Sequence, residues 1–114
     1  MYELDRNILN CHLSGFAHYA GPSVFGELKV GTELFIQAEP DNPYDPEAVA
    51  VFYGDKKIGF LPKDRNDILC RTLLYSSTNP YEVFINRISP EVNPDRQIGI
   101  VVRVKDTREH AKEN

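Results

Sequence analysis

The run Ala48-Val-Ala-Val-Phe-Tyr53 constrains the fold more than any other stretch of the sequence. It is almost wholly apolar and rich in β-branched and aromatic side chains, which favour strands, and it lacks the polar alternation of a strand that has one face in water. The run therefore predicts a central strand covered on both faces. Gly54-Asp-Lys-Lys57 then predicts a tight hairpin turn into a further strand over residues 58–61.

Four other segments have the composition or the period-two pattern of strands. They cover residues 6–15, 33–38, 81–88 and 97–105. One segment, about residues 64–76, has helical spacing, with Asp64 and Asp67 arranged like a capping box, and residues 23–29 fit a single helical turn. Strands and helices do not alternate, so the sheet is predicted to be mostly antiparallel. Five or six strands with one helix must curl to cover a core, which predicts a mainly β fold, a small and partly open β-barrel.

At 114 residues the chain has the length of one compact domain. We expect this domain to cover residues 1–105 and a strongly charged tail to follow over 106–114. No apolar run approaches the roughly 20 residues of a membrane span, and the N-terminus lacks a secretory signal pattern. These features predict a cytoplasmic protein with no membrane partner.

Charge limits the kind of nucleic acid that the chain could hold. The formal net charge is −4, from 17 acidic and 13 basic residues. Tight binding along duplex DNA needs many phosphate contacts from Lys and Arg, so this balance argues against a general DNA coat. A small site for a chain end or a few single-stranded nucleotides remains compatible with it.

The two cysteines, Cys11 and Cys70, lie far apart in the sequence, without nearby Cys or His to complete a zinc site. They are predicted to be buried free thiols, and a disulfide between them is the minor alternative.

The loop Glu39-Pro-Asp-Asn-Pro-Tyr-Asp-Pro46 is the strongest candidate for a binding site. Each proline fixes its own φ and biases the residue before it toward extended geometry. Such pre-organisation lowers the conformational entropy lost on binding, which favours a recognition surface that presents Tyr44 and Asp45. The structural alternative is that Asn42 and Asp45 bond to neighbouring backbone amides and only shape the turn.

This part of the chain resembles the HIRAN domain family. The resemblance rests on Asp41-Asn-Pro-Tyr-Asp-Pro-Glu-Ala-Val-Ala-Val51, followed by Ile58-Gly-Phe-Leu-Pro62 and preceded by Gly15-Phe-Ala-His-Tyr19, and it covers about residues 5–105. It implies an OB-like barrel with no catalysis of its own. It also implies a module that binds single-stranded DNA, since family members in fork-remodelling helicases capture a free 3′ end. A separate helicase or nuclease is the partner that such a module implies.

The resemblance implies roles for three residues of the loop. Tyr44 matches a tyrosine that stacks on a base, Asp45 matches the carboxylate that meets the terminal 3′-hydroxyl, and Asn42 falls at a polar contact position. The chemistry is coherent because a stacked ring tolerates any base, and a carboxylate accepts a hydrogen bond from a hydroxyl but repels a phosphate.

Outside the loop, His18 matches a second aromatic stacking position and Lys63 matches a basic residue near a phosphate, with Tyr19 and Phe60 as additional candidates. The alternatives are that His18 is a packed turn residue and Lys63 a solvated surface lysine. The sequence departs from the end-binding helicase members in having Ala17 where they have arginine and Phe60 where they have histidine. Because residues 36–67 also carry seven acidic and four basic side chains, a weaker affinity for DNA is expected than in those relatives.

A metal-dependent enzyme would have to use Asp41, Asp45 and Glu47. Their spacing fits no calcium loop and lacks the glycine on which such a loop turns, so no metal site, cofactor or catalysis is predicted.

A protein-interaction or self-association module is the stronger alternative. It would use an exposed sheet edge or apolar surface contributed by Phe35, Tyr75, Tyr81 and Phe84, and would make homo-oligomers possible. Nucleic-acid binding instead predicts that Tyr44, Asp45, His18 and Lys63 meet in one groove.

Overall fold

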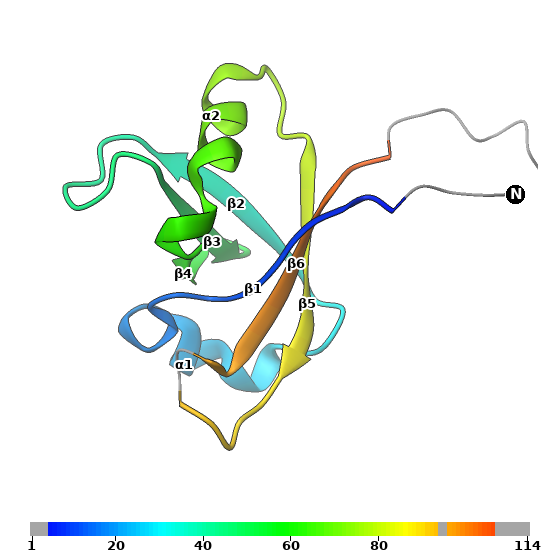
Figure 1. The fold of residues 1–114 in the computed structure, drawn as a ribbon. Coiled ribbons are helices and arrows are strands. Elements are labelled where there is room, and N and C mark those ends of the chain that lie inside the picture. Colours follow the sequence, from blue (N-terminus) through cyan, green and yellow to red (C-terminus); the bar gives the residue numbers. More distant parts are fainter. Residues whose placement is uncertain (1–4, 94–95, 107–114) are drawn as a thin grey trace, which may run out of the picture.

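Six antiparallel strands and two helices make up the computed structural model, which describes residues 5–93 and 96–106. The strands are β1 (Asn7–His12), β2 (Glu33–Glu39), β3 (Ala48–Tyr53), β4 (Lys56–Phe60), β5 (Tyr81–Ile88) and β6 (Ile98–Val104). The helices are α1 (Gly21–Val24) and α2 (Asp67–Tyr75), with short 3₁₀ turns at Phe16–His18, Phe25–Glu27 and Lys63–Arg65. The sheet curves strongly, with α1 and α2 at opposite ends (Figure 1). Of the predicted tail, residues 107–114 lie outside the described residues.

The sheet has the order β1-β6-β5-β2-β3-β4 and almost closes on itself. Strand β2 changes partner along its length, because Glu33 and Leu34 pair with β5 while residues 35–39 pair with β3. At the outer edges, Ser14 and Phe60 exchange two backbone hydrogen bonds of 2.8 and 2.9 Å. This bridge joins the segment after β1 to the end of β4, and a 2.9 Å hydrogen bond from the Ala20 N–H to the Lys57 carbonyl oxygen joins the same two parts of the chain. The predicted mainly β, partly open barrel is therefore confirmed.

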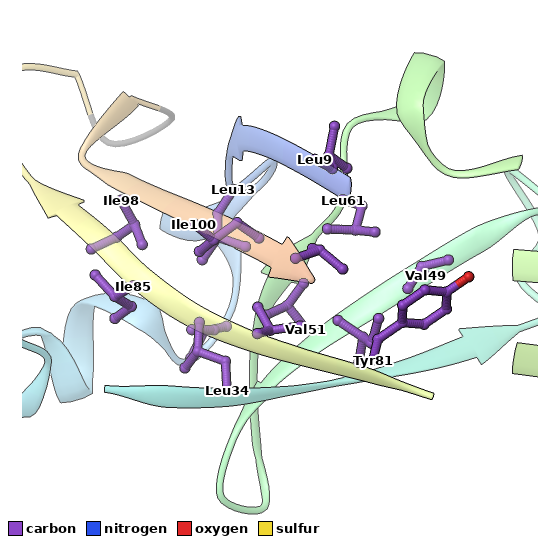
Figure 2. Close-up of a cluster of buried hydrophobic side chains, with 14 of the residues drawn as sticks. Leu9, Leu13, Leu34, Val49, Val51, Leu61, Tyr81, Ile85, Ile98 and Ile100 are labelled. Atoms are coloured by element: carbon purple, nitrogen blue, oxygen red, sulfur yellow. The ribbon is translucent and has the colours of Figure 1, made fainter. Parts of the chain in front are cut away.

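The core is formed by the inward-facing side chains of the strands, which alternate along each strand with outward-facing ones. Figure 2 shows side chains from β1, β2, β3, β5 and β6 pointing into one interior. Val51, Ile58 and Ile100 have no exposed surface, and each such burial contributes roughly 1.5–3 kcal/mol. Residues 48–51 of β3 are all buried, as predicted for a strand covered on both faces.

Helix α2 begins later than the sequence predicts. It starts at Asp67, and Asp64 lies in the preceding 3₁₀ turn, so the predicted capping box is wrong. The N-cap residue is Asn66, whose side chain makes no cap hydrogen bond and whose Nδ2 donates to Asp45. Ile68 is 65% exposed, and the buried residues of α2 are Leu69 and Cys70.

A compact turn connects β1 to β2. The helical turn predicted over residues 23–29 is found as α1 and the 3₁₀ turn after it. Gly21 lies so close to Phe16 that a Cβ there would be 2.3 Å from the buried ring. A side chain at position 21 would therefore clash with the buried ring of Phe16. Of the helices in the described residues, none has the length and apolar character needed to cross a membrane.

Candidate nucleic-acid interface

A hollow of about 240 Å³ lies between the β2–β3 loop and the end of β4. Its lining includes six residues that the sequence suggests as a site, namely Tyr19, Asn42, Tyr44, Asp45, Phe60 and Lys63. Four residues that sequence reasoning missed complete the lining, namely Ser14, Ala48, Leu61 and Asn66. We refer to this depression as the hollow.

Asn42 holds the loop in shape. Its Oδ1 accepts hydrogen bonds from the backbone N–H groups of Tyr44 (2.9 Å) and Asp45 (3.1 Å). Its Nδ2 donates to Glu39, which also forms an ion pair with Lys57 of β4. Burial would raise the pKa of Glu39, but the hydrogen bonds from Lys57 and Asn42 outweigh burial and keep that pKa below its ordinary value. The loop is thus tied to the barrel by an ionised glutamate.

Asp45 is partly engaged by the fold. Its Oδ1 accepts a 2.9 Å hydrogen bond from the backbone N–H of Glu47, and its Oδ2 accepts a 3.0 Å bond from Nδ2 of the buried Asn66. The pKa of Asp45 lies below its ordinary value. The hydrogen bond from the Glu47 N–H lowers it most, followed by the hydrogen bond from Asn66 and the charge of Lys63. A carboxylate has about four lone-pair sites, so about two remain for a ligand.

Helix α2 braces the far side of the loop. Besides the bond from Asn66 to Asp45, Arg71 forms a 3.2 Å ion pair with Glu47. The Cys70 thiol lies 4.0 Å from the Pro46 carbonyl oxygen. The loop is therefore held by β4 on one side and by α2 on the other, and the prolines limit the freedom that remains. Asn66 could not be found from the sequence, because it is 21 positions from the carboxylate that it binds.

An aromatic pair forms one wall of the hollow. The rings of Tyr19 and Phe60 meet edge to face with centroids 5.4 Å apart. Nζ of Lys57 lies 4.9 Å from the Phe60 centroid and 5.6 Å from that of Tyr19, a cation–π arrangement that fixes both rings. The wall is rigid and apolar, and it carries a cation at its edge.

Tyr44 stands apart from this wall with 88% of its surface exposed. A tyrosine left so open on a braced loop contributes little to the core, and its ring face is available for stacking. Lys63 is also exposed, and it lies near enough to Asp45 to lower the pKa of that carboxyl.

His18 does not line the hollow, although the sequence aligns it with a stacking position. It is exposed in the 3₁₀ turn, and the next residue, Tyr19, contributes its ring to the hollow instead. Tyr19 is the first residue after the turn and has extended backbone, so its side chain leaves the chain in a different direction from that of His18.

The cysteines are free, Cys70 being buried and Cys11 partly buried. Burial raises the pKa of both thiols, that of Cys11 to about 11, so neither is activated as a nucleophile. Within residues 5–93 and 96–106, no three His, Cys, Asp or Glu side chains are grouped so as to hold a metal ion.

We expect Cys11 to react slowly with iodoacetamide at neutral pH, at least about tenfold more slowly than a small thiol, because the thiolate is the reactive form. The rate should rise about tenfold per pH unit between about pH 7 and pH 9, as the thiolate fraction grows. Mass spectrometry of Cys70→Ser protein would measure this rate for Cys11 alone. A rate that levels off near pH 8 would contradict the raised pKa.

Taken together, a small antiparallel barrel and a braced loop beside an aromatic-lined hollow define a binding domain of the OB-like kind. A family model described as the HIRAN domain matches residues 7–105. The chain therefore belongs to the HIRAN domain family, whose members are in general DNA-binding modules. A sequence search of the curated proteins finds no significant match.

Two solved structures share the fold. The HIRAN domain of human HLTF is 18% identical, with a TM-score of 0.66 over 84% of this chain and 73% of that one. A protein from Lactobacillus plantarum is 16% identical, with a TM-score of 0.72 over 89% of this chain and 96% of that one. At these identities the likeness concerns the fold alone.

Proposed function

We propose that this chain is a cytoplasmic, non-catalytic module that binds single-stranded DNA in the hollow and accepts a free 3′ end there. The observation that supports the proposal most is the meeting of Tyr44, Asp45 and Lys63 around one depression. These residues supply a stacking face, a hydroxyl acceptor and a phosphate partner. A separate helicase or nuclease would then act on the strand.

The roles follow from the chemistry of each wall. A terminal base would stack on Tyr44, and the Tyr19–Phe60 wall would contact the next base or the sugar in place of His18. The open lone pairs of Asp45 would accept the 3′-hydroxyl hydrogen, while Lys63 would meet a phosphate on the 5′ side. Asn42 would act mainly through the loop that it holds, since its Oδ1 already accepts two hydrogen bonds.

The alternative function, a protein-interaction or self-association module, has support from exposed apolar side chains outside the hollow. Tyr75 is 85% exposed and Phe35 52%, whereas Tyr81 is buried and adds nothing to such a surface. Nucleic-acid binding is favoured because Asp45 is not wholly engaged by main-chain amides. Sedimentation velocity over a range of concentrations would reveal a dimer if the alternative were correct.

The 3′-end proposal predicts that an oligonucleotide with a 3′-hydroxyl binds about tenfold more tightly than the same strand with a 3′-phosphate, a difference of roughly 1.4 kcal/mol. Asp45→Asn should remove most of this preference, because a neutral amide no longer repels the phosphate. Fluorescence anisotropy of 5′-labelled strands at low salt measures both quantities.

Asp45→Asn can keep the bond from the Glu47 N–H, but its amide nitrogen would face the donor Nδ2 of Asn66, so a thermal melt should verify that the variant is folded. If both strands bind wild-type protein equally, end recognition is excluded while strand binding stands. If neither strand binds at low salt, the whole proposed function is excluded.

A further inference from the structure

A second depression, larger than the hollow, lies on the other side of the Leu61–Lys63 segment. Its volume is about 520 Å³, and we call it the cleft. Four separate parts of the chain line it. Their polar side chains include Asn10 and His12 of β1, Arg65 of the 3₁₀ turn, and Asn86 and Arg87 of β5, while β6 contributes Gly99 and Ile100. Its chemistry is polar and cationic, in contrast to the aromatic wall of the hollow.

The two arginines of the cleft differ from Arg6, Arg71 and Arg103, which are held in ion pairs within the fold. Arg6 and Arg103 pair with Glu82, and Arg71 pairs with Glu47. Within the described part of the chain, by contrast, neither Arg65 nor Arg87 has a carboxylate within ion-pair distance. Two guanidinium groups without internal partners thus line one concave surface, where a planar, bidentate donor suits a phosphate.

The floor of the cleft is kept open and ordered. Asn86 donates a 3.0 Å hydrogen bond to Asn10 across the outer face of the sheet. Gly99 lies beneath, and a Cβ there would come within 3.1 Å of both the Asn86 amide oxygen and the Arg87 Cβ. The absence of a side chain at this position lets Asn86 and Arg87 pack closely over β6, which places the Arg87 side chain at the cleft.

The geometry points to a continuous path for one strand. We propose that the cleft binds phosphodiester groups of the single strand whose 3′ end lies in the hollow, an inference that rests on the proposed function. Lys63 lines the hollow and Arg65 lines the cleft, and both belong to the same short turn. A strand that leaves the hollow past Lys63 therefore meets Arg65 next and Arg87 beyond it.

Asp64 also lines the cleft, and its carboxylate limits how strongly an anion binds there. The cleft is accordingly a site for successive phosphates of a strand that is already anchored, and a free phosphate ion should bind it poorly. The remaining polar side chains, His12, Asn10 and Asn86, offer ring and amide groups for sugar and base edges.

The test compares a thymidine dinucleotide with an oligothymidine of about 12 nucleotides, within the site sizes known for OB folds. The variant is Arg65→Ala/Arg87→Ala, and the control is Lys29→Ala/Lys56→Ala, which removes the same charge from side chains that line neither depression. Anisotropy titrations are repeated at several salt concentrations, because each phosphate contact of a single strand contributes about 0.7 to the slope of log K against log salt.

We expect the arginine variant to bind the long strand roughly tenfold more weakly at low salt and to reduce the salt slope by about 1.4, while binding of the dinucleotide is unchanged. An equal loss in the lysine control would overturn the inference, because it would reflect overall charge. The inference would also be overturned if the arginine variant bound the long strand as wild-type protein does while Tyr44→Ala weakened that binding, a result that leaves the proposed function intact. Failure of wild-type protein to bind either strand would reject both.

Discussion

Tyr44→Ala is expected to weaken the binding of single-stranded oligonucleotides by about 5- to 150-fold, since stacking of a base on an aromatic ring is worth roughly 1–3 kcal/mol. The free energy of unfolding should change by less than about 0.5 kcal/mol, because an exposed side chain away from the core contributes little to stability. Tyr44 meets that condition with 88% of its surface exposed. Anisotropy titrations and urea melts of the same preparations would measure the two effects separately.

The chain offers a matched control in Tyr75, which is 85% exposed on α2 and lines neither the hollow nor the cleft. Tyr75→Ala should bind as wild-type protein does. Tyr44→Phe should also bind nearly normally, because stacking needs the ring and not the hydroxyl. Equal losses in Tyr44→Ala and Tyr75→Ala would mean that the strand does not use the hollow.

Gly59→Ala is expected to cost about 3 kcal/mol of folding free energy. Gly59 has φ +157°, a region that is almost restricted to glycine, and adopting it costs other residues roughly 1–3 kcal/mol. A Cβ at this position would also lie 2.7 Å from the carbonyl oxygen of Ser14, a backbone atom that cannot rotate away. That oxygen accepts the Phe60 N–H in the bridge that closes the barrel, so the clash falls where the fold is joined by two hydrogen bonds.

For a domain of this size, such a loss lowers the melting temperature by roughly 12–20 °C. Gly26→Ala is the control, because a Cβ on Gly26 would meet nothing within 4 Å and its melting temperature should hardly change. Ser14 and Phe60 also line the hollow, so the protein that remains folded should bind oligonucleotides more weakly. A melting temperature for Gly59→Ala close to that of Gly26→Ala would show that the bridge does not depend on glycine.

The prolines of the β2–β3 loop stiffen a segment that the fold also holds in place. The prolines stiffen the loop locally, and side-chain interactions hold it in addition. These interactions are made by Asn42 within the loop, Lys57 on β4 and Asn66 at the start of α2. A loop held in this way loses little entropy when a ligand binds. The structural and functional interpretations of Asn42 and Asp45 are therefore compatible, because the same bonds that shape the turn leave Tyr44 exposed.

Most of the barrel could be predicted from the sequence because the signals for its strands and turns lie in residues that are neighbours in the chain. Period-two alternation and β-branched runs mark the strands, and β3 and β5 have the predicted bounds, 48–53 and 81–88. Glycine at the β3–β4 turn sets the hairpin, and prolines mark the stiff loop. Each of these signals depends on a residue and its near neighbours in the chain, so no knowledge of the packed molecule is needed.

What only the tertiary structure decided involves residues that are distant in sequence. The side chain of Asn66, directly before α2, donates a hydrogen bond to Asp45, and α2 begins at Asp67, later than the sequence predicts. Tyr19 lines the hollow and His18 does not, because the chain leaves the short turn in a direction that brings the Tyr19 ring against Phe60. The cleft exists only because the packing of four separate segments brings Arg65 and Arg87, which are distant in sequence, to one surface. Periodicity determines which side of a strand is apolar, whereas the contacts between side chains of different elements are fixed only when the barrel closes.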